Sequence, residues 1–273
     1  MSENSFSRML KHAGRMLLPA GARRALRRRL IENEESHQAG AVSYGYEIIE
    51  GEISPDLLRG WQDPAVAERQ HRSFAPLLRQ MHRGKAREDF VAVATAVQMT
   101  RLEDPLIIEV GCGSGWNSEV LKQLLNRSVR YIGLDYSPTM TTLGKRCYPD
   151  AQFVVGDAMA LPLQDGACDI LLSGTVLMHL AGYREAIQES RRVARRWCIF
   201  HTVPIAQKRP TTVLKKFAYE SPVVEVVFNE AELLRLIESS GMVVRQRLEN
   251  FRYDLSDILG EPTLNCTYLC EVT

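Results

Sequence analysis

Apolar residues recur along this chain with two spacings. Short runs in which nearly every position is apolar are separated by longer stretches with apolar positions three or four residues apart. Such runs are typical of buried strands, and the longer spacing is typical of amphipathic helices. The alternation predicts an α/β fold with a doubly wound, mainly parallel sheet. Strands are expected at 106–110, 130–135, 151–157, 168–174 and 197–203, and helices are expected up to residue 125 and over 138–147, 183–194 and 230–240.

The chain beyond residue 204 departs from this alternation. Two strand-like segments, 242–253 and 263–272, follow each other without a helix, so we expect them to pair as an antiparallel edge. The connection 204–229 is expected to be an unusually long loop. Cys266 and Cys270, four residues apart in the last strand, are expected to be buried side chains on one face.

The chain before the first strand is expected to form an arm and a cap. Helical spacing covers residues 63–100, with a break at Gly84, and the turn-rich segment 40–60 is expected to be irregular. We therefore expect a basic amphipathic arm at 1–35, a helical cap at 36–100 and a main domain at 101–273.

Charge is concentrated in the arm. The net charge is only +1, yet residues 1–30 contain eight Lys and Arg residues and one acid, Glu3. An amphipathic basic segment suits the surface of an anionic membrane, and peripheral contact is expected through residues 1–31. The same segment also fits a transit peptide, an RNA-binding arm, or a helix pair packed on its own domain or on another subunit.

Composition indicates a protein of the cytoplasm. No apolar run approaches the length that spans a bilayer, and no signal peptide is recognised. The six cysteines are scattered without a CxxC pair, so reduced thiols are expected and no metal site is predicted.

A glycine-rich turn, EVGCGSGWN (109–117), follows the first expected strand. Gly111, Gly113 and Gly115 form a G-x-G-x-G pattern, which lacks the third glycine of a dinucleotide fingerprint and the Lys of a P-loop. Glu109 stands at the strand tip, where a carboxylate would repel a pyrophosphate and favour a ligand with positive charge. S-adenosylmethionine (SAM) is such a ligand, although an acid at this place can also brace the loop.

Three later strand ends carry further candidates. Asp135 ends the second strand and can accept both hydroxyls of a ribose, as acids do in NAD sites as well. Asp157, followed by Ala158, can read an adenine edge or simply stabilise a turn. The fourth strand ends at Ser173, next to a glycine that permits close approach of the backbone.

Taken in order, these segments resemble the motifs of class I SAM-dependent methyltransferases, in particular the small-molecule group. The resemblance rests on LIIEVGCGSG, YIGLDYSPTM, FVVGDAMALPLQDGACDILLSGTVLMHL and LLRLIESSGM, within residues 106–242. It implies a seven-stranded sheet whose last strand is antiparallel. It departs from the family at RRVARRWCIF, where the usual glycine turn before the fifth strand is missing.

The resemblance also implies roles for single residues. Glu109, Gly111, Gly113 and Gly115 would line the methionine part of SAM. Asp135 would hold the ribose, with Tyr136 beside it. Asp157 and Ala158 would flank the adenine, and Ser173 is a further candidate for cofactor contact.

Two histidines are candidates for a general base. His179 follows the fourth strand and His201 is expected to end the fifth, so both would lie at the edge that faces the acceptor, as bases or as structural residues. The predicted function is SAM-dependent methyl transfer to an oxygen or carbon of a small-molecule, lipid or glycan acceptor. A nucleic-acid acceptor is disfavoured because no Pro-Pro-aromatic turn or Pro-Cys nucleophile occurs.

Three alternatives stay open at this point. The first is an RNA methyltransferase that docks through the arm, the second is a SAM-binding protein without catalysis, and the third is an NAD(P) oxidoreductase.

Overall fold

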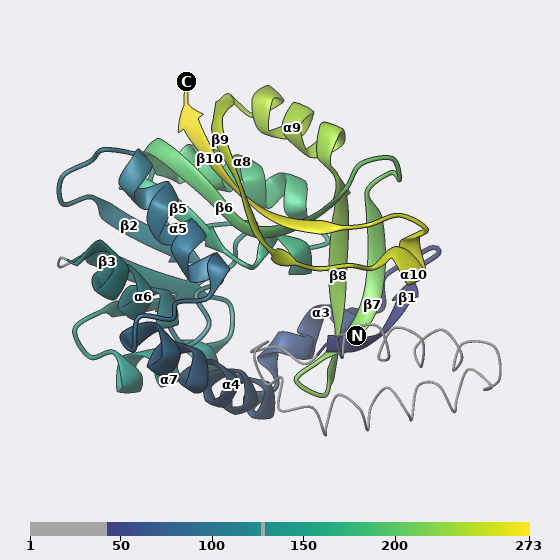
Figure 1. Cartoon of the computed structure of the whole chain (residues 1–273), viewed down its shortest axis with the longest axis horizontal. Coiled ribbons are helices and arrows are strands. Elements are labelled where there is room, and N and C mark those ends of the chain that lie inside the picture. The colour runs from purple at the N-terminus through teal and green to yellow at the C-terminus, as the bar shows by residue number, and fades with distance from the viewer. Residues whose placement is uncertain (1–42, 127–128) are drawn as a thin grey trace, which may run out of the picture. The chain divides into compact units, whose positions relative to one another are not determined.

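A computed structural model describes residues 43–126 and 129–273 (Figure 1). The chain divides into two compact units, residues 1–40 and 41–273, and the described residues belong to the second. The predicted arm therefore lies outside the described residues, as does the beginning of the predicted cap.

Seven strands of the described chain form a core sheet in the order β4–β3–β2–β5–β6–β10–β9. The first five of these are mutually parallel, and β10 is antiparallel to both of its neighbours. The predicted fold class, with its antiparallel last strand, is confirmed. The strands are β2 (Leu106–Val110), β3 (Arg130–Asp135), β4 (Gln152–Val155), β5 (Cys168–Gly174), β6 (Ala194–Ala206), β9 (Met242–Arg252) and β10 (Leu264–Val272).

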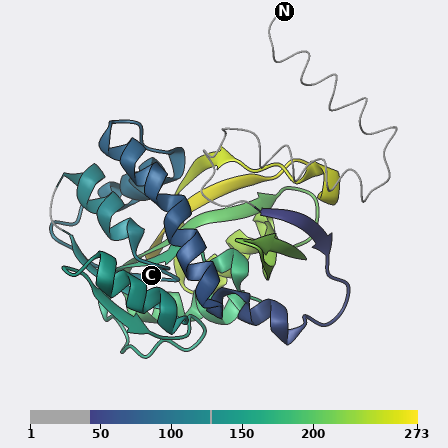
Figure 2. The same cartoon turned by 90° about the horizontal axis from the view of Figure 1, so that it is seen from below.

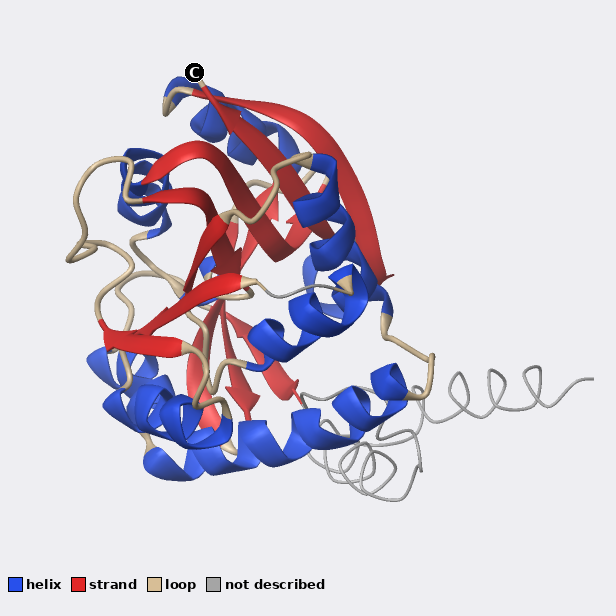
Figure 3. Ribbon diagram, turned by 90° about the vertical axis from the view of Figure 1, so that its left-hand side faces the viewer, coloured by secondary structure: helices blue, strands red, loops and turns tan. Residues whose placement is uncertain are grey.

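Helices cover both faces of this sheet (Figure 3). Because side chains alternate along a strand, Ile107 packs with α5 (Glu88–Met99) and α6 (Trp116–Leu125), whereas Ile108 packs with α8 (Tyr183–Val193) and α9 (Glu230–Ser239). Helix α7 (Pro138–Cys147) contacts β3 and β4, and the short α10 spans Ser256–Leu259. Both Cys266 and Cys270 are fully buried, as expected.

The junction between α8 and β6 has no intervening loop. Val193 ends the helix and Ala194, already extended, begins the strand. The missing glycine turn therefore leaves a direct passage from helix to strand.

Two predictions about loops are wrong. The segment 40–60 contains strand β1 (Ser43–Ile48), and the connection 204–229 contains β7 (Thr212–Ala218) and β8 (Ser221–Asn229). These three strands form an antiparallel extension, and β8 joins it to the core by pairing with Ile205 and Ala206 of β6.

The hairpin between β7 and β8 lacks the residues by which a sequence usually predicts such a turn. Its two loop residues, Tyr219 and Glu220, have φ values of 51° and 66°, the conformation of a type I′ turn. Glycine and asparagine usually mark this turn, and here neither does. Arg69 stabilises the loop by donating to the Tyr219 carbonyl at 2.8 Å and pairing with Glu220 at 3.1 Å.

The cap is helical beyond β1. The helical elements of the predicted cap segment are α3 (Pro55–Arg59), the 3₁₀ turn η1 (Gly60–Gln62), α4 (Pro64–His82), which begins at a capping Asp63, and α5, which packs on the core sheet. Figure 2 shows α4 as a long helix running beside α6 and α7 towards the extension, whose hairpin loop it reaches through Arg69. No helix of the described chain is both long enough and apolar enough for a transmembrane span.

Candidate functional site

The glycine turn after β2 is built for close packing. Gly111, Gly113 and Gly115 have φ values of 69°, 54° and 84°, which side-chain-bearing residues rarely adopt. A Cβ at Gly111 would lie 2.3 Å from Val176, and one at Gly115 would lie 2.5 Å from Phe153. The turn therefore brings the start of α6 against β3 and β4 without a third glycine of the dinucleotide type.

Glu109 is buried at the tip of β2, with 1% of its surface exposed. Its carboxyl group accepts a hydrogen bond from the Asn117 amide at 2.7 Å and another from the Tyr131 hydroxyl. Burial raises the pKa of Glu109 to about 8 because ionisation in this environment is costly. Its bonds go to side chains of α6 and β3, so it does not brace the loop amides.

Asp135 connects the end of β3 to the glycine turn. Its two oxygens accept from the backbone amides of Gly113 and Ser137, each at 2.9 Å. Burial raises the pKa of Asp135 to about 6, although these two bonds oppose the shift. Each carboxylate oxygen has a second lone pair, so both can accept a further hydrogen bond.

Helix α4 adds residues that carried no sequence signal. His71 contacts the Ser114 hydroxyl through Nδ1 at 3.0 Å, and Gln70 reaches the same turn. Within the part of the chain that the structure describes, the Gln70 Oε1 atom is buried without a hydrogen-bond partner, as is the Oδ1 atom of Asn117. Unpaired buried oxygens are rare in proteins and usually mark the place of a ligand or a water.

Tyr136 has a hydrogen-bond partner far away in the sequence, whereas Asp157 has a local one. The Tyr136 hydroxyl donates to the Leu58 carbonyl at 3.2 Å, which ties the end of β3 to α3. Asp157 is exposed, and its Oδ1 accepts from the Met159 amide at 2.9 Å, as expected for a turn residue. Ala158 beside it is buried.

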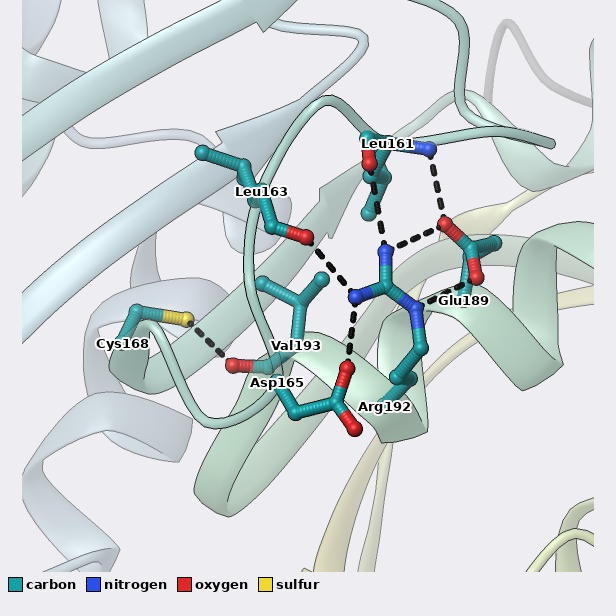
Figure 4. A network of polar contacts seen from close by, with 7 residues as sticks. All are labelled: Leu161, Leu163, Asp165, Cys168, Glu189, Arg192 and Val193. Carbon is teal, nitrogen blue, oxygen red and sulfur yellow. Dashed lines mark hydrogen bonds and ion pairs between the residues drawn. The ribbon is translucent and has the colours of Figure 1, made fainter.

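The loop that follows Asp157 is held by Arg192 of α8 (Figure 4). The guanidinium donates to the carbonyls of Leu161 and Leu163 at 3.1 and 2.7 Å, and to Asp165 at 2.8 Å. Glu189 orients the guanidinium and also accepts from the Leu161 amide at 2.7 Å. One arginine thus fixes the loop between β4 and β5.

His179 lies beyond the end of β5, in the turn η2 (Leu177–His179). The buried Ser173 precedes it, and Thr175 redirects the chain with a φ of 59°, a strained conformation for a β-branched residue. His179 donates from Nδ1 to the Val224 carbonyl at 2.8 Å, because a carbonyl can only accept. Nε2 therefore carries the lone pair, and burial together with the charge of Lys216 lowers the pKa of His179 to about 3.

His201 has a different setting from the one expected. It lies inside β6, which continues to Ala206, so the prediction that it ends the strand is wrong. A bulge places His201 and Thr202 opposite the single residue Thr267, whose hydroxyl lies 2.9 Å from Nδ1 of His201. Burial lowers the pKa of His201 to about 4. The two histidines thus have separate partners.

A buried ion pair lies on the inner face of the extension. Lys216 of β7 and Glu225 of β8 form a salt bridge, and both side chains are almost completely buried. The Tyr253 hydroxyl donates to Glu225 at 2.5 Å and lies 2.5 Å from the Tyr46 hydroxyl. In the sequence, only the charged residues at inward-facing strand positions indicate this cluster. They can be interpreted in this way only after β7 is recognised as a strand.

Comparison with known proteins identifies a methyltransferase domain in this chain. Residues 108–200 match the family described as a methyltransferase domain. A protein of Mycolicibacterium smegmatis, described as a "probable S-adenosylmethionine-dependent methyltransferase", is 27% identical over 150 residues, or 53% of this chain and 54% of that protein. The demethylmenaquinone methyltransferase of Lactococcus lactis is 29% identical over 138 residues, or 48% and 54%. The chain thus spans about half the length of these two relatives.

A solved structure agrees with this picture at the level of the fold. The 1,6-didemethyltoxoflavin-N1-methyltransferase of Burkholderia thailandensis has a TM-score of 0.53 and 16% identity, covering 84% of this chain and 95% of that one.

Proposed function

We propose that this chain, which carries a class I SAM-dependent methyltransferase domain at residues 108–200, methylates an oxygen or carbon of a small-molecule acceptor. The observation that carries the proposal is the pair of buried carboxyl groups, Glu109 and Asp135, which meet at one glycine turn. In the described part of the chain, neither forms an ion pair with a basic side chain, so a cationic ligand would supply the missing positive charge.

The residues around the turn fit SAM. Asp135 has one free acceptor position on each oxygen, which suits the two hydroxyls of a ribose. The unpaired oxygens of Gln70 and Asn117, together with Glu109, offer three acceptors for an ammonium group. SAM supplies a methyl group on a sulfonium, an electrophile that the protein has only to align with an acceptor.

His179 is the proposed base of the reaction. Its Nε2 is the unprotonated nitrogen, and a pKa of about 3 keeps the ring neutral at physiological pH. An acceptor hydroxyl with an ordinary pKa of ~10, such as an aromatic one, does not release its proton to so weak a base before the reaction. The acidity of that oxygen rises as its bond to the methyl carbon forms, so Nε2 accepts the proton late in the step. His201 stays a second candidate.

The class of acceptor is inferred from the relatives and from the site. Demethylmenaquinone methyltransferases among the relatives agree with a small molecule, and a lipid or glycan acceptor is compatible with the same site. Peripheral membrane contact through residues 1–31, a cytoplasmic location and an RNA-docking role of the arm stay predictions.

The test begins with calorimetry of the full chain against SAM and, in parallel, against NADH. We expect SAM to bind at micromolar concentration and NADH not to bind. A panel of hydroxyl-bearing acceptors is then screened for release of S-adenosylhomocysteine. NADH binding without SAM binding would overturn the proposal, and SAM binding without turnover on any acceptor class would favour a SAM-binding protein without catalysis.

A further inference from the structure

Trp61 of the cap presents an unused hydrogen-bond donor beside His179. The two rings lie with centroids 4.7 Å apart and planes inclined by 54°. The indole Nε1 is buried and has no hydrogen-bond partner in residues 43–126 and 129–273. Leaving a buried N–H unpaired costs free energy, so a donor retained in this state calls for a ligand that completes it.

The position of Trp61 is fixed by close packing. Gly60, the residue before it, lies so near β8 that a Cβ would stand 2.2 Å from the Pro222 carbonyl oxygen. The Ser221 hydroxyl donates to the Gly60 carbonyl at 3.3 Å. Tyr219 meets the indole edge-on, with ring centroids 5.9 Å apart. The indole therefore belongs to a rigid wall and is not a mobile surface group.

The imidazole beside it presents the complementary atom. Since Nδ1 of His179 donates to Val224, Nε2 is an acceptor, and it has no partner among the residues that the structure describes. The nearby Lys216 forms a salt bridge with Glu225, so this pair as a whole has no net charge to attract an ion.

We propose that Trp61 and His179 form a recognition site for a neutral aromatic hydroxyl group of the methyl acceptor, an inference that rests on the proposed methyltransferase function. The hydroxyl donates to Nε2 of His179 and accepts from Nε1 of Trp61. A carboxylate offers only acceptors and leaves Nε2 unpaired, whereas an ammonium offers only donors and leaves the indole N–H unpaired. A hydroxyl satisfies both atoms, and the rings of Trp61 and Tyr219 suit an aromatic carrier.

Because the residues lie outside the matched domain or at its acceptor edge, the proposal concerns what this chain adds to the fold. Trp61 stands in the cap, before residue 108. The site assigns to the cap a part in choosing the acceptor by its hydrogen-bonding pattern.

The test uses phenol and anisole as probes on the full chain loaded with S-adenosylhomocysteine, with binding followed by NMR of the histidine ring nitrogens. Phenol can both donate and accept, whereas anisole can only accept. We expect phenol to shift the His179 Nε2 resonance, and Trp61→Phe to weaken both probes by about threefold to tenfold. His179→Asn, whose amide can still donate to Val224, is expected to weaken phenol by a similar factor and to leave anisole unchanged.

Trp197→Phe is the matched control, because the indole Nε1 of Trp197 is likewise buried and unpaired among the described residues but lies near the beginning of β6. It should leave the affinity of both probes within twofold of the wild type. Affinity for S-adenosylhomocysteine, measured separately, should be the same in the wild type, Trp61→Phe and Trp197→Phe.

Three outcomes would overturn the inference: no phenol binding to the loaded wild type, equal phenol affinity in Trp61→Phe, or loss of S-adenosylhomocysteine affinity in Trp61→Phe by the same factor as phenol. The last would assign the indole N–H to the cofactor. Failure of the wild type to bind S-adenosylhomocysteine at all would instead contradict the proposed function.

Discussion

The tips of β2 and β3 bury two carboxyl groups that have no basic partner among the described residues. The region beside β5 and the extension instead holds a partly buried, neutral imidazole next to an ion pair. On the first side, burial raises the pKa of Glu109 to about 8 and that of Asp135 to about 6. On the second, burial lowers the pKa of His179 to about 3, and Glu225 balances Lys216. The carboxyl groups of the first side have no positive charge beside them among the described residues, whereas the charges of the second side are paired.

The difference shows what each side is suited to bind. A buried acid with a raised pKa is stabilised in its charged form by a bound cation, so the β2–β3 side favours a cationic ligand. The side with the imidazole gains nothing from a charged ligand, but it retains an unpaired donor on Trp61 and a lone pair on His179. The β2–β3 side selects its ligand by charge, and the side with the imidazole selects its ligand by the pattern of hydrogen-bond donors and acceptors.

The largest expected effect comes from unbalancing the second side. Lys216→Met would leave Glu225 buried without its cation, and we expect the free energy of unfolding to fall by about 3–5 kcal/mol. The double variant Lys216→Met/Glu225→Leu removes both charges and should recover most of this loss. Chemical denaturation of the three proteins measures the effect, and a double variant no more stable than the single one would contradict the account of a balanced pair.

The cofactor side of the site is the part that sequence reasoning could find. Glu109, Asp135 and the glycines stand at the ends of consecutive strands, so the order of elements along the chain already brings them to one edge of the sheet. Their mutual contacts, such as that between Asp135 and Gly113, follow from that order. The roles assigned to them in binding SAM stay predictions.

The acceptor side could not be found in the same way. Trp61 meets His179 across more than 100 residues of chain, and nothing local in either segment signals the contact. Lys216 and Glu225 resemble solvent-facing residues until a hairpin is recognised, and its turn lacks the residues that usually mark one. His201 was misplaced because β6 continues past it to pair with β8 and β10. These features depend on tertiary pairing.

A smaller effect is expected from Asp135→Asn on the first side. The amide retains the size of the side chain but loses the charge and one acceptor, so SAM affinity should fall by about 100-fold, the cost of one or two hydrogen bonds to a charged group. Calorimetry gives the affinity, and circular dichroism checks that the fold is retained. Affinity within threefold of the wild type would show that the ribose is held elsewhere.

The smallest effect, and the sharpest test of the comparison, is a proton released from Glu109. With a pKa of about 8, this group is largely protonated at pH 7 in the ligand-free protein, and a bound cation lowers that pKa. Binding of SAM at pH 7 should therefore release close to one proton. The binding heat should then differ between phosphate and Tris buffers in proportion to their ionisation enthalpies.

The controls for this release separate charge from contact. Glu109→Gln has nothing to release, so its binding heat should not depend on the buffer, and its affinity should fall by about tenfold through the lost charge–charge attraction. 5′-Methylthioadenosine, which lacks both the sulfonium and the ammonium, should release no proton from the wild type. If the heat of SAM binding to the wild type did not depend on the buffer, the protonation of Glu109 would not respond to the charge of the ligand.

The raised pKa of Glu109 also makes the stability of the ligand-free protein depend on pH. The folded-state pKa of Glu109 lies above its usual value of 4.5, so the folded protein binds more protons than the unfolded chain between about pH 5 and 8. Stability contributed by this group is therefore present at low pH and lost as pH rises through 8. His179 acts in the opposite sense between its folded pKa of about 3 and its usual 6.5, where the unfolded chain binds more protons. The melting temperature of Glu109→Gln should accordingly exceed that of the wild type by more at pH 8 than at pH 5. An equal difference at both pH values would show that the proton is bound elsewhere.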